Sequence, residues 1–229
     1  MSKLKKIKFS LFVVYAIICA ISVYLIVVNH KYKFEIKPFP TLVLVTLFLI
    51  ETKKYTKTFI AYLLLSLVGD VLTSIPYGFN PGIISYGLSY LVLVNFLRKY
   101  LSKETYKLLV IYLLLFGFLF TVIYVFVLND PGNSMLPILF YGVCICLVTS
   151  FILMNYIESM EHGNFILLVA IGFRIISDSI YAIVLFSETD MYFDIFSLST
   201  LLVSNFLFYK GFLFNEQQVS DFFSRIDRQ

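Results

Sequence analysis

Long apolar runs separated by short polar segments dominate this chain. The first, Phe9–Val28, holds 20 residues without a charge and follows a lysine-rich start. It is longer than the apolar core of a signal peptide, about 7–15 residues, and no small-residue cleavage site follows, so we predict a retained membrane span. A spanning helix needs roughly 17–25 mostly apolar residues, and this criterion predicts eight spans. They are residues 9–28, 36–52, 58–76, 82–97, 107–128, 135–157, 164–186 and 191–214.

Two of these predicted spans are short. The uninterrupted apolar part of the second is Pro38–Ile50, so it spans only if Glu35 and Lys37 lie at the interface, with the Lys37 side chain snorkelling outward. The fourth follows Asn80-Pro81-Gly82, which we interpret as a turn that cannot continue a helix.

Basic residues fall almost entirely on one side of the predicted bundle. With eight spans, 14 Lys and Arg residues lie on the side of the two termini, and only Lys31, Lys33 and Lys37 lie on the other. The positive-inside rule therefore predicts that both termini are cytoplasmic. The asymmetry also favours an even number of spans.

Composition agrees with a membrane-embedded, all-α chain. Hydrophobic residues make up 60% and charged residues 14%, with a mean hydropathy of +0.89, whereas about a quarter of a soluble domain is charged. We therefore predict a single integral membrane domain over residues 1–229, a bundle of eight transmembrane helices. The net charge of +4 comes from lysines at helix ends and forms no basic face with interleaved aromatics, so nucleic acid is not an expected partner. Cys19, Cys144 and Cys146 lie in apolar runs without metal-ligand spacing and are expected to be core residues.

Two carboxylates interrupt the apolar spans, Asp70 in the third and Asp178 in the seventh. Ionisable groups at membrane depth cost several kcal/mol, so they usually line a cavity or a pathway. Both spans run from inside to outside. Asp70 lies 12 residues past Thr58 and Asp178 lies 13 past Phe165, which places both about 18–20 Å from the cytoplasmic interface. The offset of 108 residues also fits a parallel repeat of four plus four spans.

The aspartates allow two interpretations. In one they share a cavity as acid and base, because two nearby carboxylates in a low dielectric do not both ionise easily and one keeps a proton. In the other, each only bonds to a hydroxyl or backbone group inside the bundle. Arg174, one helical turn before Asp178, either binds a phosphate or carboxylate head group or neutralises Asp178. Other polar side chains that fit the same cavity, or ordinary helix packing, are Tyr86, Tyr90, Ser177, Ser179, Ser204 and Asn205.

Histidine and nucleophile chemistry are not favoured by this sequence. His30 and His162 fall in predicted loops on opposite sides, which argues against a histidine metal site or a histidine base. No Gly-x-Ser-x-Gly, His-Glu-x-x-His or Walker motif occurs. We therefore expect no metal and no cofactor, and an enzyme of this kind would use carboxylates for acid–base work.

Ordered short motifs over most of the chain resemble the YhhN-like lysoplasmalogenases, which include the animal transmembrane protein 86 group. The matching segments are Lys37-Pro38 at the second span, Ser66 to Asp70 within Leu65–Leu72, the Phe79–Tyr90 turn and helix, Pro137 with Tyr141, and Ser177-Asp178-Ser179. The chain departs from the family pattern at Tyr90, Arg174 and Asn205, where the family carries a histidine, an apolar residue and a glutamine.

This resemblance implies a membrane enzyme that hydrolyses the vinyl ether bond of a lysoplasmalogen, a membrane lysophospholipid, and releases a fatty aldehyde. A vinyl ether is protonated at carbon, and water then attacks the oxocarbenium ion, so one carboxylic acid and one carboxylate suffice. Arg174 favours Asp178 as the ionised group and Asp70 as the proton donor. The expected location is the bacterial plasma membrane. A different class also fits the same aspartates: a small transporter or lipid-binding protein without hydrolytic activity.

Overall fold

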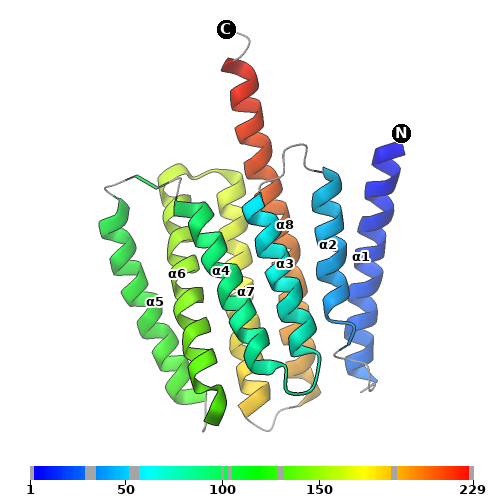
Figure 1. The fold of residues 1–229 in the computed structure, drawn as a ribbon, viewed down its shortest axis with the longest axis vertical. Coiled ribbons are helices and arrows are strands. Elements are labelled where there is room, and N and C mark those ends of the chain that lie inside the picture. The colour runs from blue at the N-terminus through cyan, green and yellow to red at the C-terminus, as the bar shows by residue number, and fades with distance from the viewer. Residues whose placement is uncertain are drawn as a thin grey trace.

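The chain folds into a bundle of helices (Figure 1). The computed structural model describes residues 3–28, 35–51, 57–98, 101–102, 105–127, 132–186 and 190–226, and these residues contain helices and no strands. The α-helices are α1 (Lys3–Val27), α2 (Pro38–Glu51), α3 (Lys57–Thr73), α4 (Phe79–Leu97), α5 (Thr105–Val127), α6 (Met135–Ser159), α7 (His162–Phe186) and α8 (Met191–Ile226). A short 3-10 turn, Gly132–Ser134, precedes α6.

The eight helices correspond one to one with the eight apolar runs, but some of their ends differ from the prediction. α1 already begins at Lys3 and α8 continues to Ile226, because polar residues can extend a helix beyond its apolar part. α4 begins at Phe79, so Asn80-Pro81-Gly82 is its first turn and not a turn before it. Proline is tolerated there because the first backbone N–H groups of a helix have no partner within the helix.

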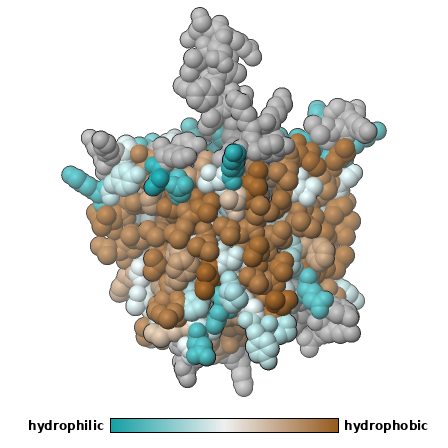
Figure 2. Space-filling model, in the orientation of Figure 1, coloured by the Kyte–Doolittle hydropathy of each residue, from teal (hydrophilic) through white to brown (hydrophobic). Residues whose placement is uncertain are grey.

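The surface of the bundle suits a bilayer. Six helices, α1 and α4 to α8, are long and apolar enough to cross a membrane. α2 and α3 have 14 and 17 residues, or about 21 and 26 Å, and fall short of a hydrocarbon core about 30 Å thick. Figure 2 shows a broad apolar belt with hydrophilic groups toward both ends. The chain is thus a multi-pass integral membrane protein.

Neighbouring helices pack in the order α1, α2, α3, α4, α6, α7, α8 and again α1, while α5 lies at the edge and packs mainly on α6. α1 begins and α8 ends at the same end of the bundle (Figure 1). α3 and α7 run in the same direction, away from the end of the bundle at which α1 begins. Asp70 on α3 and Asp178 on α7 each lie in the second half of their helix. Asp70 lies 13 positions after the start of α3 and Asp178 lies 16 after the start of α7.

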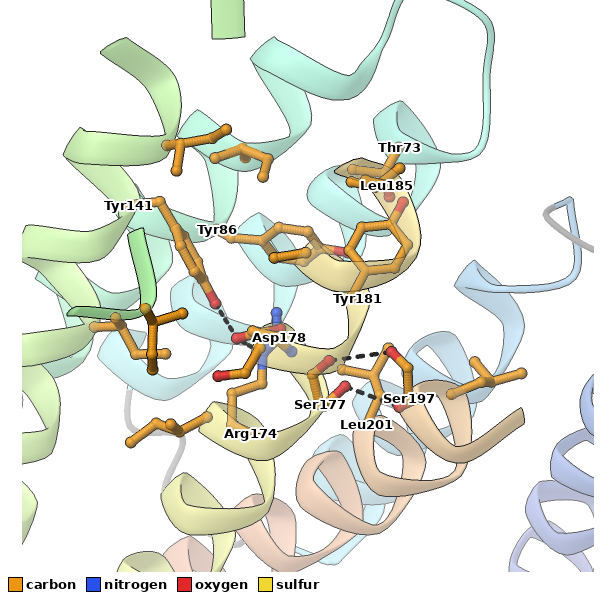
Figure 3. A pocket seen from close by; sticks show the side chains of 18 of the residues that line it. Thr73, Tyr86, Tyr141, Arg174, Ser177, Asp178, Tyr181, Leu185, Ser197 and Leu201 are labelled. Atoms are coloured by element: carbon orange, nitrogen blue, oxygen red, sulfur yellow. Dashed lines mark hydrogen bonds and ion pairs between the residues drawn. The ribbon is translucent and has the colours of Figure 1, made fainter. Parts of the chain in front are cut away.

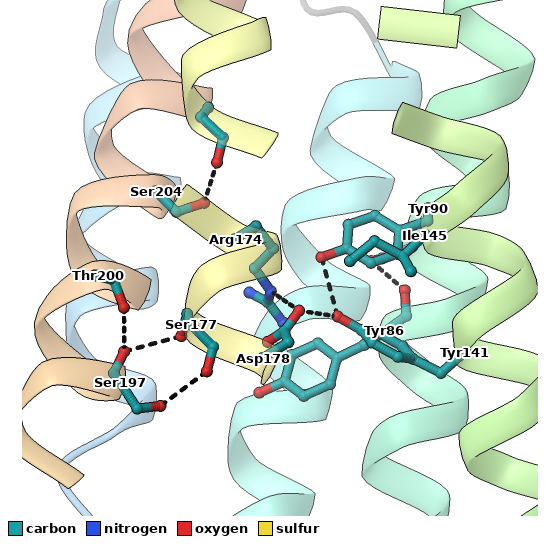
Figure 4. Close-up of polar contacts among 12 residues, drawn as sticks. Tyr86, Tyr90, Tyr141, Ile145, Arg174, Ser177, Asp178, Ser197, Thr200 and Ser204 are labelled. Carbon is teal, nitrogen blue, oxygen red and sulfur yellow. Dashed lines mark hydrogen bonds and ion pairs between the residues drawn. The ribbon is translucent and has the colours of Figure 1, made fainter. Parts of the chain in front are cut away.

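Aromatic packing and hydroxyl bonds hold these helices together. The rings of Phe59 and Phe212 stack with centroids 4.0 Å apart, which joins α3 to α8. The hydroxyls of Ser177 and Ser197 each donate to the other residue's backbone carbonyl, at 2.8 and 3.1 Å, and join α7 to α8 (Figure 4). In lipid such bonds and close packing replace the hydrophobic drive that water supplies elsewhere. The helix carrying Asp178 therefore has a fixed rotation.

Candidate active site

A largely apolar cavity of about 480 Å³ lies between the helices, toward the end of the bundle where α3 ends and α4 begins (Figure 3). Its walls come from α1, α4, α5, α6, α7 and α8, from the turn before α2 and from the end of α3. α5 and α6 contribute mainly aliphatic and aromatic side chains. The charged side chains that line the cavity are Lys37, Arg174, Asp178 and Asp194.

Asp178 is the carboxylate whose surroundings suit a reaction in this cavity. Its Oδ2 atom accepts a bond from Arg174 Nε at 3.0 Å and another from the hydroxyl of Tyr141 on α6, as Figures 3 and 4 show. Its Oδ1 atom has no hydrogen-bond partner among the described residues. The side chain is 24% exposed. One oxygen is therefore held by the protein and the other is available to a ligand or a water.

Arg174 supports Asp178 from inside the bundle. Its side chain is 7% exposed, and its guanidinium carbon lies 4.9 Å from the centre of the Tyr86 ring and 5.9 Å from that of Tyr90. The predicted contact one helical turn apart is present. The contact with Asp178 uses only Nε, so the two terminal nitrogens carry no hydrogen bond to a described residue, and Arg174 lines the cavity.

Asp70 lies behind the cavity wall. The residue is 2% exposed and does not line the cavity. The Thr41 hydroxyl donates to its Oδ2 and the Tyr86 hydroxyl to its Oδ1, both at 2.6 Å. No cation of the described residues forms an ion pair with it. The two aspartates thus belong to one connected set of contacts, but Asp70 reaches the cavity only through Tyr86.

Lys37, in the turn before α2, also lines the cavity. Its ammonium donates to the Thr73 hydroxyl at 2.9 Å and lies 5.7 and 5.4 Å from the centres of the Tyr86 and Tyr181 rings. The side chain therefore points inward rather than snorkelling outward as the sequence suggested. Because α2 and α3 are antiparallel, the register that joins Lys37 to Thr73 also joins Thr41 to Asp70.

Gly69 explains how Tyr86 approaches Asp70. A Cβ atom at this position would lie 2.7 Å from two carbons of the Tyr86 ring, closer than any ordinary contact. The missing side chain lets α4 bring the ring against α3. The Gly-Asp pair thus supplies both the acid and the space for its hydroxyl partner.

Comparison with known proteins identifies the family to which this chain belongs. The family model described as the YhhN family matches residues 32–212. The chain belongs to the YhhN family. No curated protein and no solved structure matches it. The matched part of this YhhN protein begins before Lys37 and ends within α8, so it contains every hydrogen bond and ion pair described for the site.

The remaining predicted site residues of this YhhN protein fall into two groups. Ser177 and Ser179 line the cavity, and Ser177 bonds to α8. Tyr90 is buried and lies 3.4 Å from the Tyr141 hydroxyl without lining the cavity. Ser204 bonds to the Ala170 carbonyl of α7. Asn205 lies on α8 away from the cavity lining, and no hydrogen bond joins its side chain to a described residue.

Thr41, Thr73 and Tyr181 contact the charged groups but were not expected from the sequence. Thr41 follows Lys37 by four residues and therefore shares its helix face, a signal that was present. Thr73 follows Asp70 by three residues, so its position on the same helix face could also have been predicted from the spacing. No sequence pattern predicted the contact of Tyr181 with Lys37, because it depends on how α7 packs. No three His, Cys, Asp or Glu side chains cluster as a metal site within the described residues.

Proposed function

We propose that this YhhN protein hydrolyses the vinyl ether bond of a lysolipid inside the cavity, with Asp178 beside the reacting atoms. The observation that carries the proposal is that Asp178 Oδ1 has no hydrogen-bond partner among the described residues, while Oδ2 is fixed by Arg174 and Tyr141. An apolar cavity with a few convergent polar groups is the usual form of a small-molecule site. The family match supports the same chemistry.

The cavity suits a single hydrocarbon chain with a small polar head. Its volume of about 480 Å³ falls within the roughly 300–1,000 Å³ of typical ligand sites. The apolar side chains of α5 and α6 would hold the chain. The terminal nitrogens of Arg174 and the ammonium of Lys37 would bind an anionic head group, since both are charged donors next to the cavity.

The two aspartates differ in a way that suits acid and base. Asp178 pairs with the Arg174 guanidinium at 3.0 Å and acts as the carboxylate in the proposed mechanism. Asp70 is buried, and no described cation forms an ion pair with it, so burial favours the neutral acid, whose own O–H then donates to one of its two hydroxyl partners. A proton from Asp70 is added to the β-carbon of the vinyl ether, and the resulting oxocarbenium ion is attacked by water, whose proton passes to Asp178. The hemiacetal then collapses to an aldehyde and an alcohol, and the cycle closes when that proton returns to Asp70.

Purified protein and matched lipids test the proposal. Wild type is expected to release fatty aldehyde from a 1-alkenyl lysophospholipid and to leave the 1-alkyl ether of the same length intact. Asp178→Asn and Asp70→Asn should each lose about 10²-fold or more in kcat. Asp190→Asn makes the same chemical change at an exposed position and should keep full activity. Unchanged activity in Asp178→Asn, or lipid binding by wild type without any aldehyde, would contradict the proposal; the latter result would indicate a carrier.

A further inference from the structure

The contacts around Asp70 raise the question of how its proton reaches a substrate. Asp70 does not line the cavity, and its carboxyl group has two partners, the hydroxyls of Thr41 and Tyr86. Tyr86 lines the cavity, whereas Thr41 does not. A proton leaving Asp70 for the cavity therefore has one hydrogen-bonded exit among the described residues, the Tyr86 hydroxyl.

We propose that Tyr86 is a catalytic residue that relays the proton of Asp70 to the substrate. The inference rests on the proposed hydrolysis. In this step the Tyr86 O–H bond breaks as a C–H bond forms at the β-carbon of the vinyl ether, and the Asp70 proton moves to the Tyr86 oxygen. Tyr86 is neutral before and after the step and Asp70 becomes a carboxylate, so the proton count balances.

The geometry of Tyr86 suits this role. Its hydroxyl lies 2.6 Å from Asp70 Oδ1, within the range of O–H···O hydrogen bonds. A hydroxyl both donates and accepts, so the same contact can carry a proton in either direction. The residue is 6% exposed, and its ring packs on Gly69 and lies next to the cations of Lys37 and Arg174. The relay is therefore rigid.

The positive charges around the ring also assist the step. Lys37 lies 5.7 Å and the Arg174 guanidinium 4.9 Å from its centre. Partial negative charge develops on the Tyr86 oxygen if it gives its proton before Asp70 replaces it, and two nearby cations stabilise that charge. Neither cation competes for the Asp70 oxygens, because Lys37 bonds to Thr73 and Arg174 to Asp178.

Kinetics of two matched variants test the relay. Tyr86→Phe removes the cavity-side hydroxyl and should lose about 10²-fold or more in kcat, while binding of a non-hydrolysable 1-alkyl lysolipid stays within about twofold. Thr41→Val removes the other hydroxyl and should lose less than about tenfold. Tyr86→Phe combined with Asp70→Asn should be no slower than either alone, because both remove one proton path.

The results that would overturn the relay differ from those that would overturn the hydrolysis itself. Activity of Tyr86→Phe within about tenfold of wild type, with Asp70→Asn inactive, would remove Tyr86 from the path and leave the hydrolysis intact. Equal losses in Thr41→Val and Tyr86→Phe would mean that both hydroxyls only position Asp70.

Infrared spectroscopy adds a readout that needs no turnover. Wild type should show the carbonyl band of a protonated carboxylic acid, which disappears in Asp70→Asn and shifts in Tyr86→Phe. Absence of any band that is lost in Asp70→Asn would mean that Asp70 is ionised, and the relay would be wrong.

Discussion

Gly69→Ala tests whether the close approach of Tyr86 to Asp70 is needed for activity. The added Cβ would lie 2.7 Å from two ring carbons, whereas ordinary contacts begin at 3.4 Å, so Tyr86 must retreat by about 0.7 Å. Its bond to Asp70 would lengthen from 2.6 Å to as much as about 3.3 Å, beyond the usual range for O–H···O bonds. Displacements near 1 Å in a catalytic group can cost about 10²-fold in rate.

The expected result of Gly69→Ala is therefore a loss of about 10²-fold in kcat for vinyl ether hydrolysis. Its stability should change little, because alanine gains up to about 1 kcal/mol of helix propensity over glycine while the tighter packing costs a similar amount. Gly117→Ala on α5 is the control, since nothing lies within 4 Å of its added Cβ. Full activity of Gly69→Ala would refute the reasoning, because it would show that the contact between α3 and Tyr86 can relax without consequence.

Three further substitutions test the packing around the site, each by unfolding in detergent. Arg174→Met should destabilise the protein by up to about 3–5 kcal/mol, because it leaves Asp178 without its cation; no change would mean that the pair adds nothing to stability. Ser204→Ala removes a 2.8 Å bond to α7 and should cost about 0.6–1.7 kcal/mol, so a larger loss would point to a role beyond packing. Tyr209→Phe leaves Glu51 with Lys8, 3.4 Å away, as its remaining partner among the described residues, and should cost about 1 kcal/mol, an expectation that a more stable variant would contradict.

The helices could be predicted from the sequence because each apolar run is bounded by polar residues. Their ends were less predictable, since a run of apolar residues marks what lies in lipid and not where the backbone stops being helical. α1 shows this, because its lysine-rich first turns are helical as well. Pro81 shows the opposite case, a residue that interrupts most helices but fits a first turn.

The two aspartates could be found because a charge stands out within an apolar run. Their depth could also be estimated, because each residue of a helix adds a fixed rise. The rotation of each helix about its axis could not be predicted from the sequence. This rotation decides that Asp178 faces the cavity while Asp70 lies behind Tyr86. That rotation follows from packing contacts such as the one at Gly69, which link residues far apart in the sequence.

Product analysis in deuterium oxide tests the central proposal, hydrolysis of a vinyl ether beside Asp178, most directly. Purified wild type with a 1-alkenyl lysophospholipid should release fatty aldehyde carrying one deuterium on the carbon next to the carbonyl, because the first step adds a proton to that carbon. Asp178→Asn should release little or none. Aldehyde without deuterium, equal release by Asp178→Asn, or no aldehyde from wild type would contradict the proposal.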